Sequence, residues 1–84
     1  MSEKIHNTSK GICVVSRGRH KTKFVWNPKL RTWFPVGKSN VCLYRTGSGA
    51  WRVSAPTIGD GKVLIPGGPK ARRKAFGLAA THAV

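Results

Sequence analysis

Two short clusters of basic residues have the composition of phosphate-binding sites. The first surrounds Gly18, a residue that allows a turn to approach another backbone closely; its cations are Arg17, Arg19, Lys21 and Lys23. The second begins an expected helix, where the free N–H groups already carry positive potential and extra cations are unfavourable until an anion binds; it comprises Lys70, Arg72, Arg73 and Lys74. A flexible basic loop and a purely solubilising role are the respective alternatives.

A third group of cations lies on expected strands. Side chains alternate between the two faces of a strand, so Trp51 and Val53 share one face and Arg52 points to the other. We expect an exposed sheet face that carries Arg45, Arg52 and Lys62 and follows phosphates or enters a groove. The alternative is an ordinary solvated face.

The aromatic residues Phe24, Trp26, Trp33 and Phe34 could stack on unpaired bases, although a domain this small also needs them for its core. Catalysis is not expected, because Glu3 and Asp60 are the only acidic residues and the sequence contains no phosphate loop or nucleophile motif. Cys13, His20, Cys42 and His82 lack zinc-ligand spacing. We therefore expect no enzyme activity, no cofactor, no metal and no disulfide, with both cysteines half-buried on strands.

The charge balance indicates a polyanionic partner. Sixteen Lys and Arg residues face two acidic ones, for a formal net charge of +14 and a pI of about 11.4. A compact domain with this charge repels itself, and nucleic acid is the usual neutralising partner. A membrane surface would require a basic amphipathic helix with bulky apolar residues, whereas the expected helix is rich in alanine. A surface that is merely highly charged is the remaining alternative.

Short apolar runs between turn residues predict an α+β fold, mainly β, with small antiparallel sheets and one C-terminal helix. We expect strands at residues 11–16, 22–26, 31–36, 41–45, 50–54 and 62–65, and a helix at 70–83. Residues 1–10 are predicted to form a flexible polar arm, and residues 11–84 a single small β-rich nucleic-acid-binding domain. Without a membrane-spanning run or signal-peptide core, we expect a cytoplasmic protein associated with nucleic acid or the nucleoid.

Prolines and alanines refine these elements. Pro35 cannot donate a hydrogen bond, so its strand should lie at an edge or end there. Asn27, Pro28 and Lys29 predict a turn, and Pro69 fits the first helical position. One helix face carries small residues and should pack closely on a sheet; it consists of Ala71, Ala75, Leu78, Ala79 and Ala83.

Residues 41–83 resemble DNA-binding domains of the ethylene-response-factor type and the arm-binding domains of phage integrases. The matching segments are Tyr44-Arg45, residues 49–53, residues 62–67 and the helix at 70–83. The resemblance implies a three-stranded sheet in the major groove, with Arg45, Trp51 and Arg52 contacting DNA. Thr46 replaces the usual glycine after Tyr-Arg, the Trp-Leu-Gly of the third strand is absent, and DNA contact by Trp51 conflicts with a core position.

Two classes of nucleic-acid-binding protein and one class of protein inhibitor fit these observations. The first expectation is a DNA-binding regulator, architectural factor or recombination accessory protein of a phage type. An RNA-binding, ribosome-associated protein would carry the same charge, since both polymers present phosphates. An inhibitor that docks on an acidic surface of a polymerase or nuclease would also look similar. The oligomeric state and any sequence specificity stay open.

Overall fold

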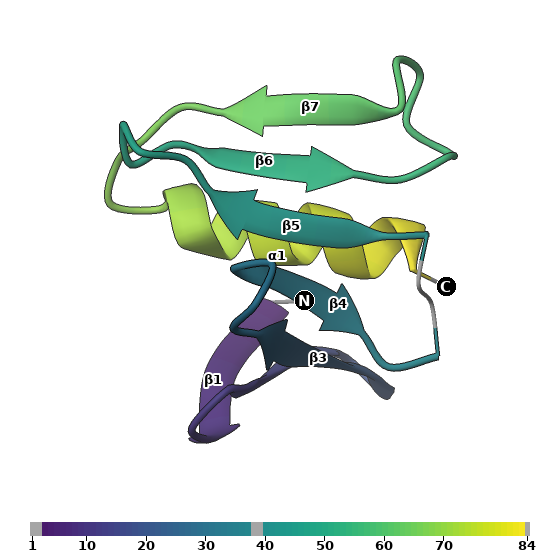
Figure 1. Cartoon of the computed structure of the whole chain (residues 1–84). Helices are drawn as coiled ribbons and strands as arrows, with labels where there is room; N and C mark the ends of the chain where they lie inside the picture. Colours follow the sequence, from purple (N-terminus) through teal and green to yellow (C-terminus); the bar gives the residue numbers. More distant parts are fainter. Residues whose placement is uncertain (1–2, 38–39, 84) are drawn as a thin grey trace.

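The computed structural model describes residues 3–37 and 40–83, which form an antiparallel sheet covered on one face by a helix (Figure 1). Within these residues, seven strands lie in the sheet in chain order, each pairing with the next. They are β1 (Glu3–Ser9), β2 (Ile12–Arg17), β3 (His20–Asn27), β4 (Thr32–Pro35), β5 (Cys42–Arg45), β6 (Trp51–Ser54) and β7 (Lys62–Ile65), and the helix is α1 (Ala71–His82). The fold is α+β and mainly β, which confirms the predicted class.

The first strand corrects the prediction of an arm at residues 1–10. Glu3–Ser9 forms β1 and pairs with β2, with Ile5 opposite Val15. Pairing uses backbone N–H and C=O groups that every non-proline residue carries, so a polar segment without alternation can still extend a sheet. Ile5 is also partly buried against the core. Residues 1 and 2 of the predicted arm lie outside the described residues.

The turns between strands follow from their residues. Gly18, at φ 59°, lies in the β2–β3 turn. In the β3–β4 turn, Asn27 Oδ1 accepts hydrogen bonds from the backbone N–H groups of Lys29 and Leu30, at 3.0 and 3.1 Å. This is the local bonding through which asparagine favours turns. The four residues after β3 therefore reverse the chain as predicted.

Two predictions about prolines resolve in different ways. β4 lies between β3 and β5 and ends at Pro35, so this proline terminates its strand and does not mark a sheet edge. Pro69 was expected at the first helical position, but it lies before the helix, which begins at Ala71. The N–H of Ala71 donates to the carbonyl of Gly68 at 3.1 Å, so Pro69 occupies the second position of a turn, where its fixed φ is favourable.

The helix packs its small side chains against the sheet, as the alanine spacing predicts. Four of the five residues of the predicted face are buried and Leu78 is partly buried; the buried ones are Ala71, Ala75, Ala79 and Ala83. On β6, Trp51 and Val53 face the helix side and are buried, whereas Arg52 and Ser54 are partly exposed on the other side. The predicted alternation on this strand is confirmed.

Phe76 holds the two parts of the sheet together. Among the residues that the structure describes, one pair, Trp33 with Leu43, joins β4 to β5, whereas four pairs join β5 to β6. The ring of Phe76 is fully buried and lies 5.2 Å from Phe24, 5.3 Å from Trp33 and 5.7 Å from Trp51, centroid to centroid. These spacings are typical of favourable aromatic pairs. One helix residue therefore packs on strands from both sides of the β4–β5 junction, which has the fewest paired residues.

Candidate functional site

The strand register places the three sheet cations on two different faces. Arg45 lies opposite Trp51, on the helix side. Arg52 lies opposite Tyr44 and Leu64, and Lys62 opposite Ser54, both on the face turned away from the helix. The expected single face with all three cations is therefore wrong, because alternation along β5 places Arg45 on the same face as the fully buried Leu43. The three contacts implied by the DNA-binding resemblance are divided in the same way.

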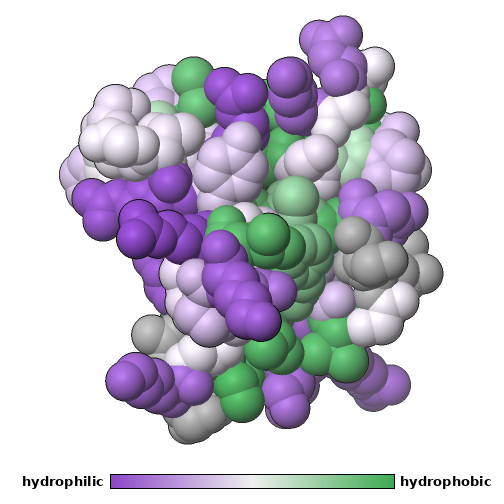
Figure 2. Space-filling view, viewed as in Figure 1, coloured by the Kyte–Doolittle hydropathy of each residue, from purple (hydrophilic) through white to green (hydrophobic). Residues whose placement is uncertain are grey.

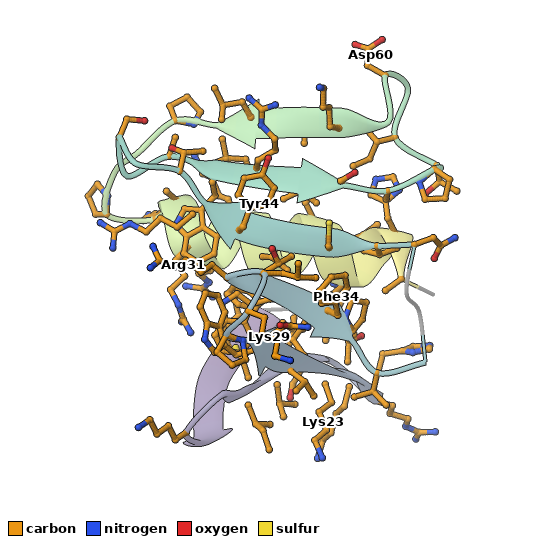
Figure 3. The ribbon with its side chains drawn as sticks, in the orientation of Figure 1. Lys23, Lys29, Arg31, Phe34, Tyr44 and Asp60 are labelled. Carbon is orange, nitrogen blue, oxygen red and sulfur yellow. The ribbon has the colours of Figure 1, made fainter. Side chains whose placement is uncertain are left out.

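The face turned away from the helix carries apolar and basic side chains together. Figure 2 shows a central band of hydrophobic residues with hydrophilic residues around it. Phe34 and Tyr44 lie on this face with Lys23 (Figure 3), and Val25 and Leu64 are 41% and 51% exposed. By register, Lys21 lies on the same face as Lys23. Two cations of the first predicted cluster thus share a face with Arg52 and Lys62.

The helix side of the sheet contains a hollow lined by tryptophans and cations. Its volume is about 630 Å³, and its residues come from the β1–β2 turn, strand ends and the first helical turn: Lys10, Gly11, Trp26, Trp33, Arg45, Trp51 and Arg72. The N–H of Trp26 donates to the carbonyl of Gly11 at 2.8 Å, which holds β3 beside that turn. We call this the aromatic hollow.

A second, more polar hollow adjoins the first. It measures about 530 Å³ and shares three residues with the aromatic hollow, namely Arg45, Trp51 and Arg72. Its remaining lining comes from the β5–β6 turn and the loop before the helix: Ser48, Gly49, Gly67 and Gly68. A Cβ at Gly67 would lie 3.2 Å from the carbonyl oxygen of Gly49, so a glycine there permits the two loops to approach. We call this the polar hollow, and we call the aromatic and polar hollows together the cleft.

Arg72 is positioned by the core beneath it. Its guanidinium carbon lies 4.9 Å from the centroid of the Phe76 ring, within the range of a cation–π interaction. Its Nη2 donates to Cys13 Sγ at 3.8 Å. Burial raises the pKa of the Cys13 thiol above 9.0, and the charge and hydrogen bond of Arg72 oppose that rise. Arg72 is thus a half-buried wall residue of the cleft.

The predicted helix cluster divides around this arginine. Lys70, Arg73 and Lys74 are exposed, whereas Arg72 lies in the cleft. The first turn of α1 contains no acidic residue, and no side chain caps it. The cations therefore surround the helix start as the sequence indicated, with one of them turned toward the tryptophans.

The β2–β3 hairpin places its cations away from the cleft. Arg17, Arg19, Lys21 and Lys23 are all exposed. Arg17 donates from Nη2 to the carbonyl oxygen of Gly77 in the helix, at 3.2 Å. This hydrogen bond directs Arg17 to the helix side, whereas Lys21 and Lys23 face the other way. The hairpin is basic, as predicted, but it does not present its charges on one side.

The aromatic set also divides between core and surface. Phe24 is fully buried, while Trp26, Trp33 and Phe34 are partly exposed. Trp26 and Trp33 lie 5.4 Å apart, centroid to centroid, with their rings tilted by 55°. The sequence did not indicate that these two rings and Lys10 would meet Arg45. No sequence signal could have shown it, because Lys10 reaches the cleft only through the unpredicted pairing of β1.

Asp60, the acidic residue whose side chain the structure describes, does not line the cleft. Asp60 lies in the loop between β6 and β7, at the top of the picture (Figure 3), beyond the Ser54 end of β6, whereas Trp51 of the cleft lies at the other end of that strand. Arg31 of the β3–β4 turn lies lower and to the left in the same picture. Lys29 and Arg31 are exposed on that turn and were not among the predicted site residues. The lining residues of both hollows include no Asp or Glu. The cleft therefore has a positive, hydrophobic character.

The two cysteines lie on separate strands of the sheet. Cys13 lies on β2 and Cys42 on β5, which confirms their predicted strand positions. Cys42 is partly buried as expected, whereas Cys13 is fully buried and not half-buried, because its side chain faces the helix side of the sheet. Among residues 3–37 and 40–83, no three His, Cys, Asp or Glu side chains gather as metal ligands would. Nor does the described part of the chain include a helix of the length and apolarity that crossing a membrane requires. No protein-family model, curated protein or solved structure matches this chain.

Proposed function

We propose that this protein binds nucleic acid, with DNA as its first candidate ligand, and acts by binding rather than by catalysis. The observation that carries the proposal is the cleft, in which three tryptophans and three cations meet without a lining carboxylate. Aromatic rings with interleaved cations suit a polymer of flat bases and phosphates. A DNA-binding regulator, architectural factor or recombination accessory protein would use such a surface.

The remaining cations support the same proposal by extending the positive surface beyond the cleft. Exposed lysines and arginines occupy the helix start, the β2–β3 hairpin and the β3–β4 turn. Cations at such positions can contact phosphates without reading sequence, and thereby set affinity and orientation. The resemblance of residues 41–83 to DNA-binding domains favours DNA over RNA, although Arg45 and Trp51 would act from the helix side and not from the face that carries Arg52.

The test is a titration at fixed, near-physiological salt with labelled single-stranded DNA, duplex DNA and an RNA hairpin of equal phosphate number. We expect DNA to bind with a Kd of about 10⁻⁶ M or tighter, since nonspecific binding by basic proteins reaches about this range. An unlabelled acidic protein serves as the competitor control and should displace little of the DNA. Tighter binding of the hairpin would replace DNA by RNA, and no binding of any of the three would reject the proposal.

A further inference from the structure

We infer that the cleft holds one unpaired nucleotide, with its base against the tryptophans of the aromatic hollow and its phosphate in the polar hollow. This inference rests on the proposed function and adds to it the form of the ligand, which is a single strand and not a duplex. The two hollows share Arg45, Trp51 and Arg72, so a base and its own phosphate can occupy neighbouring parts of one continuous site.

The aromatic hollow has the lining and size that a base requires. Trp26, Trp33 and Trp51 come from three strands, and the volume of about 630 Å³ is within the usual range for small-ligand sites. Trp33 and Trp51 both pack on the buried Phe76 ring, which fixes that wall. Trp26 packs on Trp33 and is only half-buried. A base can therefore stack at a prepared surface, with Trp26 at its margin.

The polar hollow has the lining that a phosphate requires. Arg45 and Arg72 supply two cations, and Ser48 supplies a hydroxyl that shares a hydrogen bond with Thr46 at 3.0 Å. Three glycines and Trp51 complete the wall. Within the described part of the chain, no atom outside Gly68 and its two neighbours lies within 4 Å of a Cβ built at Gly68. A backbone without side chains allows a phosphate to come close. The polar hollow thus offers a phosphate both positive charge and an accessible backbone, next to the tryptophans.

The tryptophans favour an unpaired base, because a ring can stack only on the free face of a base. Trp51 is only 8% exposed, and all three rings lie on the face covered by the helix. Bases in a duplex are stacked on each other and present only their edges, so their faces cannot reach a ring inside a hollow. A base in a single strand has a free face and can enter. The geometry therefore favours unpaired nucleotides by shape.

The experiment compares four ligands of equal length by fluorescence anisotropy and tryptophan quenching. They are oligothymidylate, oligouridylate, an abasic deoxyribose-phosphate strand and duplex DNA. We expect the abasic strand to bind about 5-fold or more weakly than oligothymidylate, because stacking of one base contributes at least this factor. Only the strands with bases should quench tryptophan fluorescence. The ratio between thymidylate and uridylate then shows whether the nucleotide comes from DNA or RNA.

The variant Trp26→Leu tests the site itself, and Tyr44→Leu is the matched control. Tyr44 is a half-buried aromatic residue on the face away from the helix (Figure 3). Trp26→Leu should weaken oligothymidylate binding about 5-fold or more and change abasic-strand binding little, whereas Tyr44→Leu should change neither. Circular dichroism and thermal unfolding verify that both variants are folded. If Trp26→Leu unfolds, Arg45→Gln provides a second variant, which we expect to bind both oligothymidylate and the abasic strand more weakly.

Different failures separate this inference from the proposed function. Equal binding of abasic strand and oligothymidylate would overturn the nucleotide site while leaving an electrostatic nucleic-acid-binding protein. Tighter binding of duplex than of single strand would overturn it in the same way. An unchanged affinity of both Trp26→Leu and Arg45→Gln would also remove the site from the cleft. No binding of any ligand would overturn the inference and the proposed function together.

Discussion

At the scale of single residues, Arg72 differs most from its prediction. The sequence placed it among four equivalent cations at the helix start, but its guanidinium lies over Phe76 and beside Cys13. A cation that also packs on the core affects stability as well as binding when it is truncated. Arg45 lines both hollows and makes no such contact with Phe76, so Arg45→Gln separates binding from stability better than a change at Arg72.

The buried thiol of Cys13 predicts a pH dependence of stability. Burial raises its pKa above 9.0 in the folded chain, so the unfolded chain releases this proton at lower pH. The protonated Cys13 thiol therefore contributes to the free energy of unfolding. This contribution is fully present below the pKa that the thiol has in the unfolded chain, and it is lost as pH rises through the higher pKa of the folded chain. We expect the free energy of unfolding, measured in urea, to fall more steeply above pH 9.0 for the natural chain than for Cys13→Ala. Parallel curves throughout the alkaline range would contradict this assignment.

At the scale of elements, the sequence predicted what is local. The last strand was placed at its observed bounds and the helix within one residue at either end, because alternation, turn residues and alanine spacing act over a few residues. β1 was missed because an edge strand can pair through its backbone without an apolar pattern. The cleft was missed for a related reason: its lining comes from segments far apart in the sequence, and Lys10 and Gly11 belong to the turn after the unpredicted strand β1.

The approach of two loops at the polar hollow predicts unequal effects of two neighbouring glycines. In Gly67→Ala the new methyl would lie 3.2 Å from the Gly49 carbonyl oxygen, whereas Gly68→Ala would place its methyl in open space. We expect Gly67→Ala to be less stable than Gly68→Ala by about 1 kcal/mol or more, since overpacking at a close contact carries a cost of this order. Urea unfolding of the two variants measures the difference.

The second variant is the control, because both gain the same methyl and lose similar freedom in the unfolded chain. Equal stabilities, or a less stable Gly68→Ala, would show that the β5–β6 turn and the loop before the helix do not approach as described. The comparison therefore tests the geometry of the polar hollow without any ligand.

At the scale of the whole molecule, charge and shape work together. A net charge of +14 destabilises a compact chain by self-repulsion. Asp60, the acidic residue whose side chain the structure describes, lies in the β6–β7 loop and lines neither hollow, so no carboxylate is among the lining residues around Arg45 and Arg72. A ligand that binds the folded chain stabilises it by mass action, so a polyanion in the cleft would offset part of this repulsion. The large size and the positive sign of the net charge therefore both favour a phosphate polymer as the ligand.

The central claim, nucleic-acid binding, is tested most directly by the salt dependence of affinity for oligothymidylate. Each neutralised phosphate releases counterions, and a single strand contributes about −0.7 per phosphate to the slope of log K against log salt. With about five to eight phosphates contacted, the slope should be about −3 to −6. Anisotropy titrations over a series of sodium chloride concentrations measure it. A slope in that range supports the account, and a slope near zero would contradict it.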